Sequence, residues 1–464
     1  LTTAQVVALT TAQVAGLTTA QVAALSSSQL GAMEVTDVRA LTTAQAAVFD
    51  TTQAEGLTTA QIAALSTANV RALQNATLAS LTSEQLNALG TAQVQALGTA
   101  QVASLTTDQL SNLETADLAA MTTAQLQAIA ASNFSSLGSE HIAALTTAQV
   151  AALTTAQVQA LQTEQIEGMT AAGVRALGTQ HFAVLSSAQV DAMNTDQVAA
   201  IETVDLRALR ASELSGLGTD DIVALSTAQF AALQTAQVAA LATEQIEVIE
   251  TRDLVALSAA QVTAFGAAGI AALTTEQVAV LKTDQVAGLS TAQIGALDTA
   301  QVVALSTNAV RVLTTAQAAT LSSEQVSVME TAQVAALTTA TMRNLTNDAV
   351  AALTTGQVNV LSTAQTSALS NGQVASLTTD QIQALQTRNI ATLSTAQVQA
   401  LGDTGADVLT SAQINALTSA QAAALTTAQI ATLSTDQITA LSVNNVRVLT
   451  VAQAAALNSE QVNA

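Results

Sequence analysis

The chain has 464 residues, half of them hydrophobic, with no Pro, Cys, Trp or Tyr and only five Phe. The lack of Cys excludes disulfides, thiol catalysis and thiolate metal sites. A formal net charge of −22, from 33 acidic and 11 basic residues, argues against nucleic-acid partners and anionic membrane surfaces. The charge indicates a soluble, self-repelling surface, with a diffuse site for divalent cations as the alternative. No apolar run approaches the roughly 20 residues that a membrane-spanning helix needs.

The sequence divides into octapeptides from its first residue to its last. Since 464 / 8 = 58, residues 1–464 make 58 octads, with no insertion or deletion. The consensus L-T-T-A-Q-V-x-A is seen from Leu1 to Ala8 and again from Leu145 to Ala152. Repeat arrays grow by stacking, so we predict one continuous array. Neither end carries a distinct capping repeat, which we interpret as a segment of a longer protein.

The eight positions of the octad differ in what they tolerate. Position 1 is always Leu, Met, Ile or Phe, and position 6 is apolar in every octad except the one with Thr366. Positions 2 and 7 vary freely, so we expect positions 1 and 6 to point inward and positions 2 and 7 to face water. Position 3 is Thr, Ser, Asn or Asp in 50 of the 58 octads. Those residues cap helix N-termini, which predicts a helix of about six residues per octad, followed by a tight two-residue link.

The predicted fold is therefore all-α, a solenoid or superhelix of 58 short helices. Helices this short are unstable alone, so each must stack on its neighbours. Gln at position 5 could bridge adjacent turns, or simply lie on a solvated face. The runner-up is a β-solenoid, because a period of eight keeps side-chain alternation in phase, although Ala and Gln are poor strand formers. A continuous helix is disfavoured, because eight residues advance about 80° past two turns and the Leu stripe would spiral.

A longer period runs through the departures from the consensus. Val38-Arg39 recurs at Val174-Arg175, Val310-Arg311 and Val446-Arg447, in steps of 136 residues or 17 octads. All ten Arg fall in such irregular octads. An Arg on a mostly acidic surface is a candidate lateral contact. The alternative is that the Arg residues have no role and were copied when an ancestral block of 17 octads was duplicated. The candidate lateral or inter-turn contacts are Arg39, Arg71, Arg175, Arg207, Arg311, Arg343 and Arg447.

Residues able to support catalysis are scarce. His141 and His181 both replace the Gln of position 5, whereas a zinc site needs three or four converging ligands. Ser and Thr are plentiful but lack the base that nucleophilic catalysis requires. A regular Thr row could bind ice, but helix capping accounts for it better. We expect no catalytic residues, no metal site and no cofactor, and hence no enzyme.

The motif L-T-T-A-Q-V-x-A resembles octapeptide arrays in very large secreted or surface proteins of Gram-negative bacteria, often labelled adhesin, haemagglutinin-like or haem-utilisation proteins. The resemblance covers the whole chain and implies an extracellular, surface-attached role. We therefore expect a structural fibre, filament or stalk segment that associates with itself or with neighbouring repeats of the same protein. The alternative is an adhesin or binding module that uses the solenoid surface.

Overall fold

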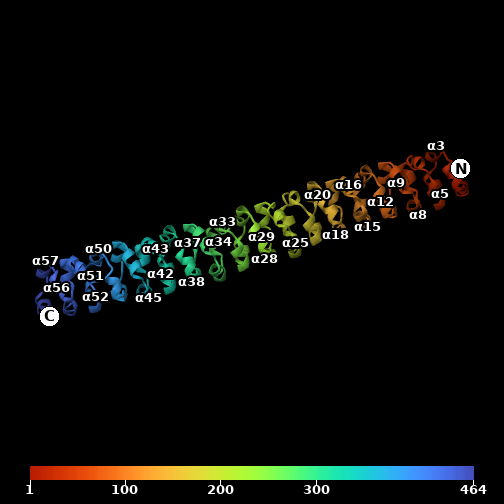
Figure 1. Cartoon of the computed structure of the whole chain (residues 1–464). Helices are drawn as coiled ribbons and strands as arrows, with labels where there is room; N and C mark the ends of the chain where they lie inside the picture. The colour runs from red at the N-terminus through yellow and green to blue at the C-terminus, as the bar shows by residue number, and fades with distance from the viewer. The chain divides into compact units, whose positions relative to one another are not determined.

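The computed structural model describes residues 1–464 and is helical throughout, with 58 short α-helices, one for each octad, and no strand (Figure 1). The chain forms two compact units, an N-terminal unit Leu1–Leu233 and a C-terminal unit Gln234–Ala464. The N-terminal unit holds helices α1 (Thr3–Val7) to α29 (Thr227–Ala232), and the C-terminal unit holds α30 (Thr235–Ala239) to α58 (Ser459–Asn463). The prediction of an all-α array of 58 short helices is confirmed, and the β-solenoid is excluded.

Helix bounds follow the octad. Every helix begins at position 3 except α34 (Gly266–Ala271) and α51 (Gly402–Asp407), which begin at position 2. Most helices span five or six residues and end at position 7 or 8. The four-residue helices end at position 6: α6 (Thr43–Ala46), α17 (Ala131–Phe134), α23 (Thr179–Phe182), α26 (Thr203–Leu206), α27 (Ala211–Leu214), α40 (Thr315–Ala318) and α49 (Thr387–Ile390).

The link that follows a six-residue helix ending at position 8 consists of two extended residues, except at Phe265 and Leu401, where a single residue in the αR conformation joins two helices. Between α18 (Ser139–Ala144) and α19 (Thr147–Ala151), Leu145 has φ −61° and ψ 134°, and Thr146 has φ −68° and ψ 156°. Thr146 is the N-cap, and its side chain accepts a hydrogen bond from the backbone N–H of Gln149 at 3.2 Å. The Gln149 side chain accepts the Thr146 N–H in return, at 2.9 Å. This reciprocal capping box starts the helix.

The cap therefore lies one residue earlier than the sequence suggested, at position 2 instead of position 3. Position 3 is the first helical residue, as at Thr147. Position 2 tolerates Gly, Gln or Glu because the Gln side chain maintains half of the box by itself. At Gly90, for example, the backbone N–H still donates to Gln93 Oε1 at 2.7 Å. The variability of position 2 concealed its capping role.

The helices of each unit wind so that a helix packs against the one three octads further along. The closest pairs are always three apart, as with α13 (Thr99–Ala103) and α16 (Thr123–Ala128) in the N-terminal unit, or α30 and α33 (Ala259–Ala264) in the C-terminal unit. Each turn of the solenoid thus takes between three and four octads. A single octad buries little apolar surface, so its helix is stabilised by the turns on either side.

The core of each unit is a column of position 1 and position 6 side chains, as predicted. In the octad Leu153–Ala160, positions 1, 5 and 6 are buried, positions 2, 3, 4 and 7 are exposed, and position 8 is half-buried. Phe134 and Phe182 occupy position 6 and are fully buried in the N-terminal unit, as is Met342 in the C-terminal unit. Thr366, the polar exception at position 6, is also buried, and its hydroxyl donates to Ser362 O at 3.1 Å.

Candidate functional site

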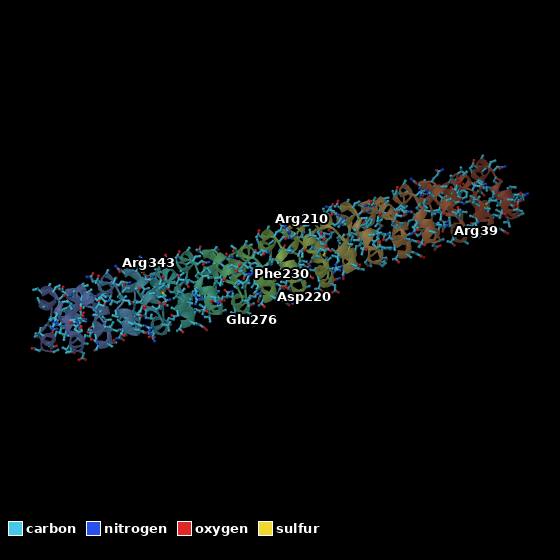
Figure 2. All side chains as sticks on the ribbon, viewed as in Figure 1. Arg39, Arg210, Asp220, Phe230, Glu276 and Arg343 are labelled. Atoms are coloured by element: carbon cyan, nitrogen blue, oxygen red, sulfur yellow. The ribbon has the colours of Figure 1, made fainter.

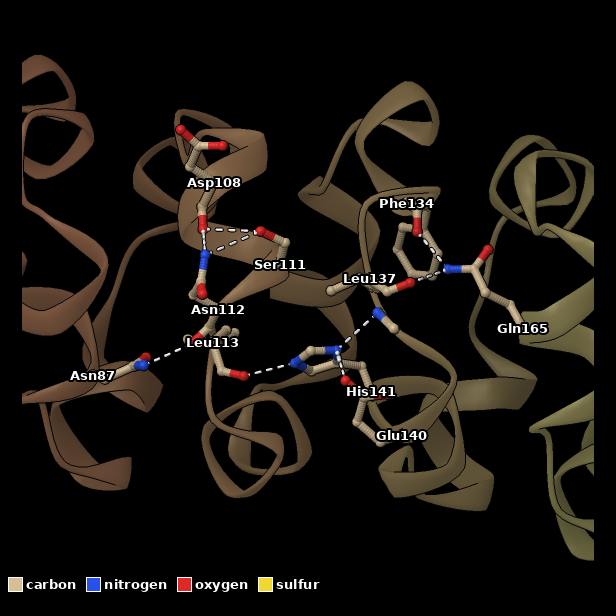
Figure 3. Close-up of polar contacts among 11 residues, drawn as sticks. Asn87, Asp108, Ser111, Asn112, Leu113, Phe134, Leu137, Glu140, His141 and Gln165 are labelled. Atoms are coloured by element: carbon tan, nitrogen blue, oxygen red, sulfur yellow. Dashed lines mark hydrogen bonds and ion pairs between the residues drawn. The ribbon is translucent and has the colours of Figure 1, made fainter.

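The side chain at position 5 joins one turn of the solenoid to the turn before it. In Gln157, Oε1 accepts the Thr154 N–H at 3.0 Å, and Nε2 donates to Leu126 O and Ile129 O, both at 2.9 Å. Gln165 makes the same bonds to Phe134 O and Leu137 O (Figure 3). The acceptors lie 31 and 28 residues earlier in the chain, so one amide caps its own helix and also bridges to the preceding turn.

This arrangement recurs along each unit, from Gln45 onward in the N-terminal unit and up to Gln461 in the C-terminal unit. A carbonyl at position 1 lies outside the helices and, when buried, needs a donor from elsewhere. The Gln amide is that donor. Of the two roles considered for position 5, the bridge between turns is the one observed. We call these bonds the position-5 ladder.

Both histidines at position 5 keep a contact to the carbonyl 28 residues earlier. His141 Nε2 lies 2.6 Å from Leu113 O while its Nδ1 accepts the Gly138 N–H at 2.9 Å (Figure 3). His181 does the same with Leu153 O at 2.8 Å. Both histidines are therefore replacements for Gln within the ladder, as the sequence indicated.

Several buried carboxyl groups at position 5 were not singled out from the sequence. Asp117 is 3 % exposed, and burial raises its pKa to about 6, with a further contribution from the Glu114 charge. Burial also raises the pKa of Asp37, and Glu34 adds to the shift. The available signal was that position 5, if not Gln, is most often another polar residue. A position that simply faced water would tolerate any residue, so the preference for polar residues indicates a buried polar contact.

The predicted arginine sites all lie on exposed surface at position 7. Arg39 and Arg343 are labelled on their respective units in Figure 2. Arg71 makes a contact between turns, because its Nη1 donates to Ala96 O at 3.5 Å. Gln127, also at position 7, makes the corresponding bond to Ala152 O at 2.6 Å. The inter-turn role is thus open to any long polar side chain at this position, and lateral contacts between molecules stay a prediction.

The irregular octads that start at Ile129, Phe265 and Leu401 also recur in steps of 136 residues, and the backbone changes at the second and third of them. Gly266 and Gly402 have φ of 68° and 69°, a region that residues other than glycine rarely adopt. The ladder shifts there by one residue, so that Gln429 Nε2 donates to Gly402 O at 3.2 Å. Ala130, at the equivalent place in the first block, is extended, with φ −60° and ψ 140°. The three blocks therefore share a sequence position and not a backbone conformation.

The surface is only shallowly hollowed. A depression of about 400 Å³ in the C-terminal unit is lined by Glu247, Glu250, Glu276 and Arg252, among others, and Arg252 Nη2 is paired with Glu250 Oε2 at 2.6 Å. No three His, Asp or Glu side chains are placed to hold a metal ion. None of the helices is long and apolar enough to cross a bilayer.

Short helices that are individually capped, and bonded turn to turn through position 5, define a helical-repeat solenoid. The chain belongs to the ALTTAQ repeat family. The family matches residues 1–27, 30–67, 64–99, 86–115, 110–147, 142–171, 171–200, 198–235, 217–248, 246–283, 279–307, 296–329, 326–363, 382–419 and 407–435. No curated protein matches the chain.

Proposed function

We propose that this chain is a non-catalytic structural segment that spaces or displays other parts of an extracellular bacterial surface protein. The position-5 ladder carries the proposal. Within each unit the Gln side chains at position 5 bond one turn to the turn before it, in most octads through the backbone carbonyls 31 and 28 residues earlier. In such an array each repeat depends only on its neighbours, so its length can change by whole octads without disturbing a central core. That property suits a spacer.

The spacer role is tested by shortening the chain in register. Deleting residues 57–112, which is seven octads or twice the 28-residue ladder step, should preserve the helical circular dichroism spectrum. Particles seen by electron microscopy should become shorter in proportion. Deleting residues 57–60, half an octad, should disrupt the fold locally. If the seven-octad deletion abolished folding, the chain would depend on particular residues inside the deleted stretch, and the spacer proposal would fail.

The extracellular location is tested on intact source cells. Antibodies raised against the chain should label whole cells, and externally added protease should remove the labelling without cell lysis. Labelling only after permeabilisation would contradict the proposal. The net charge of −22 also supports a well-hydrated surface that resists non-specific collapse.

Self-association is the second part of the proposal, supported by Arg residues spaced regularly on an acidic surface. Sedimentation velocity at low salt should reveal concentration-dependent association that weakens at high salt. Replacing Arg39, Arg175, Arg311 and Arg447 by Ser should reduce the association, and replacing the same four by Lys should retain part of it. A monomer at every concentration would leave the chain as a spacer without lateral contacts. Capture of a ligand by the monomer would favour the adhesin role instead.

A further inference from the structure

Some octads place a carboxyl group where the position-5 ladder needs a hydrogen-bond donor. In four of them Asp replaces Gln at position 5 and Glu stands at position 2, and none of these four has the reciprocal capping box. The four pairs are Glu34 and Asp37, Glu114 and Asp117, Glu202 and Asp205, and Glu250 and Asp253. The Asp of each pair is 4 % exposed or less.

Buried asparagines show what a side chain of this length can do at position 5. Asn69 Nδ2 donates to Leu41 O at 2.9 Å, and Asn445 Nδ2 donates to Leu417 O at 2.7 Å. Both acceptors lie 28 residues earlier, in the same register as the Gln ladder. Asp has the same length and shape as Asn, so its carboxyl group can reach the same carbonyl. An ionised carboxylate has no hydrogen to donate there, whereas a protonated carboxyl has one.

Asp37 shows the resulting deficiency. It is 2 % exposed, and its Oδ2 is buried without a hydrogen-bond partner. The carbonyl in register is that of Leu9. Helix α5 (Val35–Ala40) packs against α2 (Thr11–Ala15) and α8 (Thr59–Ala64), neither of which carries a titratable residue. The only charged groups of its own octad are Glu34 and Arg39.

Asp117 has a similar setting. Helix α15 (Thr115–Ala120) packs against α12 (Thr91–Ala96), which carries no titratable residue, and against α18, which carries Glu140 and His141. The His141 ring is already engaged, because Nε2 contacts Leu113 O at 2.6 Å. The remaining charged group beside Asp117 is Glu114, which carries the same sign of charge. No cation in these elements therefore supplies the donor that the carbonyl in register, Leu89 O, requires.

The octad of Glu213 shows what happens when a cation is supplied. Position 2 is Arg210 instead of Glu, and its Nε lies 3.0 Å from Glu213 Oε2. Arg210 Nη2 donates to Leu185 O at 2.9 Å, the carbonyl 28 residues before Glu213. The guanidinium thus neutralises the buried carboxylate and fills the ladder position in its place. The elements packed around Asp37 and Asp117 offer no such guanidinium, and a proton on the Asp can perform both tasks.

We propose that Asp37 and Asp117 are proton-binding sites that fasten adjacent turns of the solenoid in acid and loosen them at neutral pH. Burial and the neighbouring Glu raise the pKa of both groups, to about 6 for Asp117. For Asp117, a raised folded-state pKa means that the contribution to stability is fully present below the unfolded value of 3.8 and is lost as the pH rises through about 6. Asp205 and Asp253 are weaker candidates. Burial and Glu202 raise the pKa of Asp205, but His181 offsets part of the rise. Arg252 Nε lies 3.7 Å from Asp253 Oδ1.

The test compares Asp117→Asn with the unmodified chain, using Asp108→Asn as a control that removes an equal charge from an exposed position. Hydrogen exchange of residues 113–120, corrected for the intrinsic rate, should show about tenfold more opening at pH 7.5 than at pH 5 for the unmodified chain. The Asn variant should lose this difference and be the better protected form at pH 7.5. The control should retain the difference.

A second measurement tests the protonation of the two Asp side chains independently of hydrogen exchange. Carboxyl ¹³C resonances of Asp37 and Asp117, assigned from the Asn variants, should titrate well above those of exposed Asp residues. Midpoints near 4 for both groups would overturn the proposal, even if the variants altered stability. Equal pH dependence in the Asp117→Asn and Asp108→Asn variants would overturn it as well.

Discussion

The strongest prediction concerns the loss of one rung of the position-5 ladder. Replacing Gln157 by Leu keeps the side-chain size but removes its hydrogen bonds to Thr154, Leu126 and Ile129. Leu126 O keeps the bond from Ile129 N–H at 3.2 Å, whereas the buried Ile129 carbonyl loses its side-chain donor. One unsatisfied buried carbonyl and the lost capping bond together should cost about 2 to 4 kcal/mol.

The control for this prediction is Gln13→Leu, in the same T-T-A-Q-V context. Gln13 accepts the Thr10 N–H at 2.9 Å but is exposed, so its replacement should cost about 1 kcal/mol or less. The assay is hydrogen exchange at the amides of the mutated octad and of the turn before it, because an array of repeats opens locally as well as globally. Equal loss of protection in the two variants would refute the view that the bridge between turns, beyond the cap, stabilises the fold.

Five further substitutions test separate features of the solenoid. Thr154→Ala should destabilise its helix by about 1 kcal/mol and Thr155→Ala by much less, because only position 2 caps; a larger effect at Thr155, seen by hydrogen exchange, would contradict this. Gly402→Ala should cost about 1 to 2 kcal/mol of stability, because Gly402 has a φ of 69°. Gly295→Ala, in open space within α37 (Thr291–Ala296), should stabilise the fold by about 0.5 to 1 kcal/mol. Denaturant titration distinguishes the two outcomes. Phe182→Ala should cost about 3 to 5 kcal/mol in the same titration, and a cost below 1 kcal/mol would contradict its place in the core.

The octad period was sufficient to predict short helices with a core at positions 1 and 6. Apolar residues recur there without exception in position 1, and a continuous helix could not bury them on one side. The cap was misplaced by one residue because Thr stands at both positions 2 and 3, as in Thr146 and Thr147. The residue that explains this is Gln149. Its side chain accepts the backbone N–H of Thr146, a bond that does not depend on the side chain at position 2, so position 2 can vary.

The number of octads in a turn could not be predicted from a period of eight. It is determined by the backbone torsions of the two link residues, such as Leu145 and Thr146, and small changes in those torsions alter how far each helix rotates from the last. The buried carboxyl groups were missed for a related reason. Without the path of the chain, position 5 could face water or the preceding turn, and only in the second case is Asp117 buried beside a backbone carbonyl.

The most direct test of the solenoid measures distances between exposed residues of the N-terminal unit. The chain contains no Cys, so spin labels can be placed at Gln127→Cys with either Ala151→Cys or Ala143→Cys, all three sites being exposed at position 7. Because Gln127 Nε2 donates to Ala152 O at 2.6 Å, electron–electron double resonance should give a shorter distance for the pair 24 residues apart than for the pair 16 residues apart. A distance that simply increased with separation, at about 1.5 Å per residue for a continuous helix, would contradict the winding of octads into hydrogen-bonded turns.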